Sequence, residues 1–183
     1  MNQHLLDLVR RLGGPLRSHT FVRAVELALD RGVKEFVETG CYRGIDGDGQ
    51  STAILATVAL EVGGRFISVD LNADHVERAK AKVPNGPREI ICRDSVEYLS
   101  HRTTEIGLLY LDSYDYYHGD PLPSQIHQVA EIGAAWAKLT PNAIVLLDDC
   151  NIPGGGKGLL TEKFLLERGF TLVADSYQKL FVR

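Results

Sequence analysis

Acidic side chains follow several short apolar runs of the sequence, at or just after the point where each run ends. Asp70 closes the run FISVD, and Asp94 follows EIIC. Asp112 follows LLYL, and the pair Asp148–Asp149 follows IVLL. If these runs are parallel strands, their carboxyl ends meet at one edge of a sheet, where open α/β folds bind ligands. The acids would then surround a single ligand site.

The runs themselves alternate with longer segments of helical period. We expect strands at Glu35–Thr39, Phe66–Asp70, Glu89–Cys92, Ile106–Leu111 and Ala143–Leu147. Their nearly continuous apolar character is typical of strands covered by helices on both faces. Helices are expected at about Gln3–Leu12, His19–Arg31, Ser51–Val62, Ala73–Lys82, Ser95–His101, Pro123–Leu139 and Leu159–Glu167. This alternation predicts an α/β fold, a Rossmann-like, doubly wound and mostly parallel sheet.

The C-terminal segment departs from the parallel pattern. Two β-rich runs, 170–174 and 179–183, are separated only by residues 175–178. A parallel crossover needs a dozen or more residues, so these runs must form an antiparallel hairpin. We therefore expect a seven-stranded sheet in one domain over residues 1–183, with N-terminal helices in 1–31 and the core in 33–183.

A glycine-containing turn follows the first expected strand, in the segment FVETGCYRG. Gly40 and Gly44 allow the backbone to pass close to a ligand, and Ser51 is placed to cap the next helix. Asp70 is placed to accept hydrogen bonds from both ribose hydroxyls of an adenosine ligand. Asp94 could accept a hydrogen bond from the amino group of adenine, or could serve only as a helix cap.

This ordered set of motifs resembles the class I S-adenosylmethionine (SAM) methyltransferases. The matching residues, spaced by single strand–helix units, are Glu38, Gly40, Gly44, Asp70, Asp94, Ser95, Asp112, Asp148 and Asp149. Each motif is weak alone, and their order over residues 33–183 carries the resemblance. The resemblance implies that SAM is bound by Glu38, Gly40, Cys41, Gly44, Ser51, Asp70, Leu71, Asp94, Ser95 and Asp112.

A crowded group of carboxylates is expected where the fourth and fifth strands end. Adjacent strands lie about 5 Å apart, and carboxylates that close repel unless they are protonated or neutralised. A divalent cation such as Mg²⁺, or Ca²⁺ or Mn²⁺, would neutralise them. The group is similar to the site of the metal-dependent O-methyltransferases, of the catechol, caffeoyl-CoA and macrocin types. This similarity implies that Asp112, Asp148 and Asp149 are metal ligands. If no metal is bound, Asp148 and Asp149 merely cap the following loop.

One position departs from the catechol type. That type has a lysine base three positions after the first aspartate, where this sequence has Asp115. The catalytic candidates are therefore Asp112 with Asp115 or His118 as the proton acceptor, unless acidification by a metal suffices. Asp115 could also be a solvated turn residue. The departure favours a vicinal hydroxyl on a sugar, another phenol or a natural product over catechol.

Three further groups of residues receive a simpler interpretation. The segment PGGGKG at 153–158 lacks the Ser or Thr of a phosphate loop, so we expect a flexible loop beside the acceptor site, with Lys157 available to an anionic group. The DGDG segment at 46–49 lacks the final glutamate of an EF-hand, and the loop at 45–50 is expected to cover the cofactor or the acceptor. Apart from His118, the histidines are interpreted as helix-surface or capping residues: His4, His19, His75, His101 and His127.

Composition narrows the possible partners. A net charge of −4 speaks against a nucleic-acid partner, and no apolar run is long enough to span a bilayer or to act as a signal peptide. The cysteines, without a CxxC pair, are expected to be free thiols in the cytoplasm. A small-molecule acceptor and a homodimer are expected. The alternatives are a metal-independent methyltransferase for nitrogen or a macromolecule, an NAD(P)-dependent oxidoreductase and a non-catalytic SAM-binding module.

Overall fold

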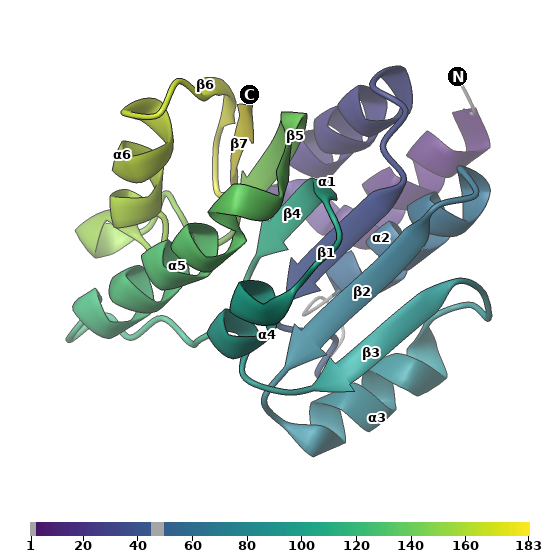
Figure 1. Ribbon diagram of the computed structural model, residues 1–183, viewed down its shortest axis with the longest axis horizontal. Coiled ribbons are helices and arrows are strands. Elements are labelled where there is room, and N and C mark those ends of the chain that lie inside the picture. Colours follow the sequence, from purple (N-terminus) through teal and green to yellow (C-terminus); the bar gives the residue numbers. More distant parts are fainter. Residues whose placement is uncertain (1–2, 45–49) are drawn as a thin grey trace.

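A seven-stranded sheet forms the centre of the protein (Figure 1), in a computed structural model that describes residues 3–44 and 50–183. The strands are β1 (Glu35–Thr39), β2 (Arg65–Asp70), β3 (Arg88–Cys92), β4 (Ile106–Leu111), β5 (Leu139–Leu147), β6 (Thr171–Asp175) and β7 (Lys179–Val182). Their order is β3-β2-β1-β4-β5-β7-β6. The first five are parallel, whereas β7 runs antiparallel to both β5 and β6. The predicted parallel sheet with a C-terminal hairpin is confirmed.

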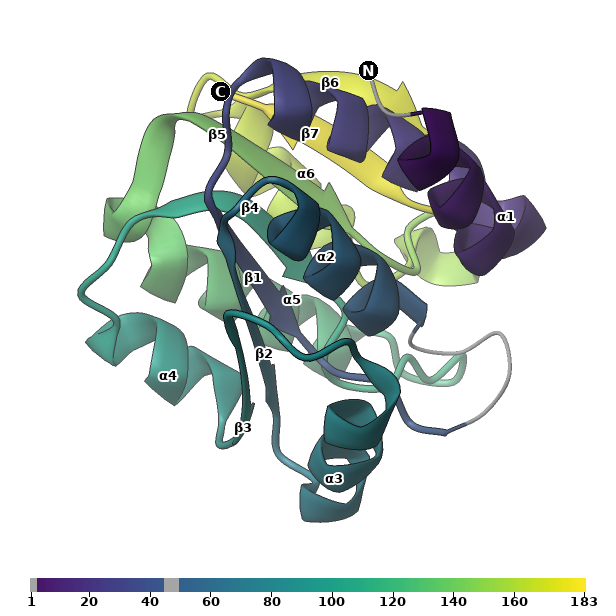
Figure 2. The ribbon, with the colours of Figure 1, turned by 90° about the vertical axis from the view of Figure 1, so that its right-hand side faces the viewer.

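Helices cover both faces of this sheet (Figure 2). One face carries α1 (Gln3–Asp30), α2 (Gln50–Glu61) and α3 (Ala73–Lys82), and the other carries α4 (Ser95–His101), α5 (Leu122–Ala135) and α6 (Leu159–Leu166). Each face has its own buried apolar cluster, and every residue of β4 is buried. This double cover explains the continuous apolar runs. No helix within the described ranges has the length and apolarity that crossing a membrane requires.

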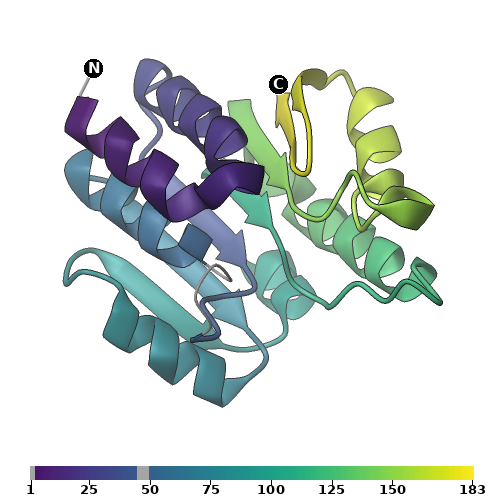
Figure 3. The same ribbon diagram turned by 180° about the vertical axis from the view of Figure 1, so that it is seen from behind.

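Helix α1 consists of two helical arms, as predicted from the sequence. It continues from Gln3 to Asp30 but bends at Gly14, where the helical backbone is interrupted (Figure 3). Pro15 follows directly, and proline favours the first turn of a helix. The second arm therefore begins before His19, the predicted start, and Arg17 lies in its first turn. Helix α1 contacts β5 and β7.

The connection from α5 to β5 also differs from the prediction. A helix was expected to continue to Leu139, but α5 ends at Ala135 and a 3-10 turn, η1 (Trp136–Lys138), follows. Leu139 is buried and pairs with Ile106 of β4, so it begins β5 instead. Tertiary strand pairing outweighs the helical period at this position.

Candidate active site

The order of the strands reverses between β1 and β4, because β2 and β3 lie on one side and β5 on the other. Ligands of open α/β sheets bind at this point. A cavity of about 190 Å³ lies there, and we name it the cofactor cavity; it is lined by Gly40, Arg43, Val69, Asp70, Leu71, His75, Asp94, Ser95, Asp112, Ser113, Tyr114, Asp115 and His127. Six of the residues predicted to hold SAM are among them: Gly40, Asp70, Leu71, Asp94, Ser95 and Asp112.

Two residues shape the floor of the cofactor cavity. Gly40 has a φ of 79°, and a Cβ added there would lie 2.7 Å from the carbonyl oxygen of Asp112, so only glycine fits without a shift. The carboxylate of Asp70 accepts hydrogen bonds from the backbone N–H groups of Cys41 (3.0 Å) and Asn72 (2.7 Å). These bonds orient an acceptor group toward a ligand in the cavity.

Glu38 lies two residues before Gly40 and is fully buried. Its Oε2 accepts hydrogen bonds from the hydroxyls of Thr52 (2.8 Å) and Ser68 (2.6 Å). Its Oε1 has no hydrogen-bond partner among the described residues. Burial raises the pKa of Glu38 to about 7, against the opposing effect of the neighbouring hydroxyls. A buried oxygen without a partner is one that a ligand's donor would satisfy.

The opposite end of the cofactor cavity is formed by α4 and α5. Asp94 caps α4, because its Oδ1 accepts the backbone N–H of Glu97 at 2.8 Å. The capping role is therefore present, and the same carboxyl group also lines the cavity. Ser95 Oγ lies 3.2 Å from His127 Nε2, and the His127 ring lies 5.2 Å from that of Tyr114.

Two histidines were interpreted wrongly from the sequence. His75 and His127 were assigned to helix surfaces or caps, yet both line the cofactor cavity. The pKa of His127 is raised by its interaction with Glu131, a buried residue one turn further along α5. Helical period alone does not show which face of α5 borders the cavity, so the sequence carried no signal for this role.

Four residues predicted to hold SAM do not line the cofactor cavity: Glu38, Cys41, Gly44 and Ser51. The Cys41 side chain is buried in an apolar cluster, and Gly44 lies against the Arg78 side chain. Ser51 is buried at the start of α2 and borders a separate small hollow with Gln50. The part of the predicted covering loop at 45–49 lies outside the described residues.

A second, larger cavity of about 550 Å³ adjoins the first, and we name it the acceptor cavity; it is lined by Arg17, Arg43, Asp112, Asp115, Tyr116, His118, Asp149, Ile152 and Tyr177. Both predicted proton acceptors, Asp115 and His118, line it. Asp115 forms an ion pair with Arg43 at 2.7 Å, and the His118 ring stands edge-on to Tyr116. Arg43, Asp112 and Asp115 border both cavities.

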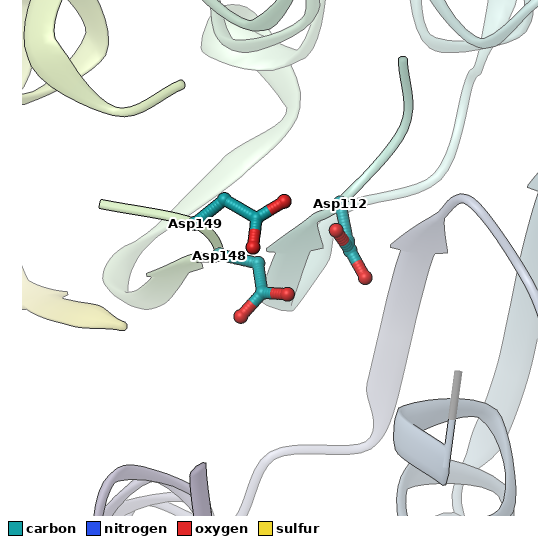
Figure 4. A group of neighbouring side chains, drawn as sticks. All are labelled: Asp112, Asp148 and Asp149. Atoms are coloured by element: carbon teal, nitrogen blue, oxygen red, sulfur yellow. The ribbon is translucent and has the colours of Figure 1, made fainter. Parts of the chain in front are cut away.

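The three predicted metal ligands lie together where β4 and β5 end (Figure 4). One carboxylate oxygen from each of Asp112, Asp148 and Asp149 lies within 4.8 Å of the others. Asp148 is fully buried, and the other two side chains are partly exposed. The predicted gathering of these carboxylates, which we name the carboxylate triad, is confirmed.

Two cations of the chain itself neutralise the carboxylate triad. The Lys157 Nζ lies 3.0 Å from Asp112 Oδ1 and 2.9 Å from Asp149 Oδ2, and its side chain is only 1% exposed. Arg17 binds Asp148 at two points, with Nε 3.0 Å from Oδ1 and Nη2 2.8 Å from Oδ2. Lys157 thus meets an anionic group, as predicted, but that group is the triad. Arg17 was not predicted, because nothing near it in sequence marks it.

Burial and charge act against each other in this cluster. Burial raises the pKa of Asp112 well above its usual value. The nearby Asp148 carboxylate adds to this increase, whereas the positive charge of Lys157 opposes it. Burial also acts upward on Asp149, but Lys157 and Tyr177 outweigh it and lower its pKa. For Lys157, burial favours the neutral form, yet Asp112 and Asp149 raise its pKa above the ordinary value. Lys157 is therefore a charged ammonium at neutral pH.

The two expected ligands fit these residues differently. The cofactor cavity suits SAM, because the close-packed Gly40 and the anchored Asp70 both line it at the point where open α/β sheets bind nucleoside ligands. The spacing of the carboxylate triad is by itself compatible with a divalent cation. However, the Lys157 ammonium lies between Asp112 and Asp149, at the position that a divalent cation would need to occupy.

Comparison with known proteins agrees with this site. Residues 37–150, more than half of the chain, match the model of a family described as a methyltransferase domain. No curated protein sequence is similar enough to count as a match.

Solved structures are similar over most of the chain. The SAH-bound methyltransferase PaMTH1 of Podospora anserina has a TM-score of 0.68 at 14% identity, covering 98% of this chain and 86% of that one. The O-methyltransferase NovP has a TM-score of 0.66 at 12% identity, covering 95% and 79%. The T. thermophilus 16S rRNA methyltransferase RsmC, in complex with AdoMet and guanosine, has a TM-score of 0.56 at 15% identity, covering 88% and 42%. At these identities the likeness concerns the fold.

The family match covers the strands that build the cofactor cavity, and the whole fold agrees with that of solved methyltransferases. The chain therefore belongs to the methyltransferase domain family and is a class I SAM-dependent methyltransferase.

Proposed function

We propose that this methyltransferase acts on a hydroxyl group of a small, polar acceptor, one of two vicinal hydroxyls on a sugar, a phenol or a natural product. The observation that carries this proposal is that the cofactor cavity and the acceptor cavity share lining residues. Arg43, Asp112 and Asp115 border both of them. A methyl donor in one cavity and an acceptor in the other would meet at these residues, as in-line transfer requires.

The acceptor cavity offers chemistry suited to hydroxyl groups. Its carboxylates accept hydrogen bonds from hydroxyls, and Tyr116 and Tyr177 add phenolic hydroxyl groups while His118 adds ring nitrogens. When bound, SAM supplies an electrophilic methyl group on a positively charged sulfur. In the transfer, the acceptor oxygen would form a bond to this methyl carbon while the carbon–sulfur bond breaks, and the electron pair of that bond would stay on sulfur. Asp115 or His118 of the acceptor cavity would accept the hydroxyl proton.

Assistance by Mg²⁺ stays a prediction from the sequence. It would require Lys157 to withdraw from Asp112 and Asp149, and the proposed reaction does not depend on it. Methylation of nitrogen or of a macromolecule is the alternative; a carboxylate-lined cavity and an acidic chain favour a neutral hydroxyl acceptor over an anionic nucleic acid.

Calorimetry with SAM and with S-adenosylhomocysteine tests the cofactor, and a screen for release of S-adenosylhomocysteine over sugars, diols and phenols tests the acceptor. We expect binding of both cofactor forms and methylation of a hydroxyl compound. The Asp115→Asn variant, which lacks one of the two expected proton acceptors, is the control and should release S-adenosylhomocysteine more slowly. Methylation of amines or nucleosides without any reaction on hydroxyl compounds would contradict the proposal.

A further inference from the structure

Every oxygen of the carboxylate triad already has a donor from the protein. Apart from the Lys157 and Arg17 contacts, the Tyr110 hydroxyl lies 3.4 Å from Asp112 Oδ2 and the Tyr177 hydroxyl donates to Asp149 Oδ1. Gln178 Nε2 donates to Asp148 Oδ1 at 2.9 Å. A metal ion at this site would therefore have to compete with side-chain donors at every one of these oxygens.

The ammonium of Lys157 is equally well satisfied. Besides Asp112 Oδ1 and Asp149 Oδ2, it lies 3.4 Å from the backbone carbonyl oxygen of Asp112. Three donors thus face three oxygens, which is the full capacity of an ammonium group. A buried charge with such partners is costly to displace, because either it or the carboxylates would be left unpaired.

The loop that carries Lys157 is built to hold it in this position. Gly156 has a φ of 61°, and a Cβ there would lie 1.9 Å from the carbonyl oxygen of Asp149, so the close approach requires glycine. The Lys157 N–H donates to that same carbonyl at 2.9 Å. Gln125 of α5 donates to the carbonyls of Gly156 (2.9 Å) and Gly154 (3.1 Å). Backbone and side-chain contacts therefore fix the lysine from several directions.

We propose that Lys157 takes the place of a divalent cation in this site, so that its ammonium is the fixed positive charge between Asp112 and Asp149 and methyl transfer proceeds without a metal ion. Lys157 is a positioning residue, since it holds Asp112, which borders both cavities, and Asp149, which borders the acceptor cavity. The statement about methyl transfer rests on the proposed function, whereas the statement about the cation does not.

The test uses the purified, chelator-treated full chain and MgCl₂, CaCl₂ or MnCl₂ alone as the probe. Calorimetry and thermal unfolding compare wild type, Lys157→Met and the double variant Lys157→Met/Asp149→Asn. Wild type should show no saturable binding at millimolar cation. Lys157→Met should gain one cation site, which the double variant loses. Lys163→Met, an exposed lysine of α6, is the matched control and should gain none.

The proposal would be overturned if the wild-type protein bound a cation saturably and the Asp149→Asn variant did not. This comparison needs no lysine variant. A folded Lys157→Met that binds no cation would also overturn it, because the triad would then not be a cation site. Lys157→Gln replaces Lys157→Met if the latter does not fold. Since the probe is the metal alone, the result is independent of the acceptor, and failure of the proposed function would appear separately in the SAM and acceptor assays.

Discussion

Arg17 and Asp148 form a two-point ion pair although 131 positions separate them in the sequence. Asp148 is fully buried at the end of β5, and Arg17 reaches it from the first turn after the bend in α1. The pair therefore fastens the N-terminal helix to the carboxyl end of the sheet.

Replacing Arg17 by Met should lower the free energy of unfolding by about 3 kcal/mol or more, because it leaves a buried carboxylate without its partner. Arg17→Lys keeps the charge but loses the two-point geometry, and should cost less. Denaturant unfolding measures both. Arg23→Met, at an exposed position of the same helix, is the control. An Arg17→Met loss no larger than that of the control would contradict the structural role.

Glu38 makes stability depend on pH in the absence of SAM. Its pKa is about 7 in the folded chain against an ordinary value of 4.5, so the folded state holds a proton that the unfolded state has lost. Stability should therefore fall as pH rises from 4.5 to about 7 and change little above. At about 1.4 kcal/mol per pKa unit, the loss is about 3 kcal/mol.

Glu38→Gln, which does not titrate, should remove this part of the pH dependence. Unfolding free energies of the two proteins at about pH 5 and about pH 8 give the difference directly. Glu61→Gln, at the exposed end of α2, is the matched control and should keep the wild-type profile. Parallel profiles for wild type and Glu38→Gln would show that Glu38 does not hold a proton near neutral pH.

Asp70 is expected to bind the ribose of SAM. Asp70→Asn should weaken SAM binding by about 2–4 kcal/mol, because two charge-assisted hydrogen bonds are reduced to neutral ones or lost. Calorimetry measures the affinity, and thermal unfolding checks that the variant is folded. Asp74→Asn, at an exposed position in the first turn of α3, is the control. Unchanged affinity in a folded Asp70→Asn would remove the ribose role.

The proton acceptor can be identified with two variants. Asp115 borders both cavities, whereas His118 borders only the acceptor cavity, so we expect Asp115 to act as the base. Asp115→Asn should lower kcat by on the order of 100-fold or more, with a smaller effect on KM. His118→Gln should lower kcat less. Steady-state kinetics on the identified acceptor compares them, and the reverse order of effects would assign the base to His118.

Much of the site was predictable because it depends on local pattern. Apolar runs mark the strands, and parallel strands bring their carboxyl ends to one edge. Asp70, Asp112 and Asp148 therefore had to lie near one crevice once the alternation of strands and helices was recognised. The terminal hairpin was equally predictable, since the connection between its strands is too short for a parallel crossover.

Only the tertiary structure decided how the carboxylates are neutralised. Electrostatic repulsion among them demands a positive charge, but that demand does not say whether a metal or a side chain supplies it. Lys157 lies 45 positions after Asp112, and Arg17 lies 131 positions before Asp148. Coulomb interactions depend on distance in space, and these distances exist only after the bend at Gly14 and the turn at Gly156 bring the cations to the triad.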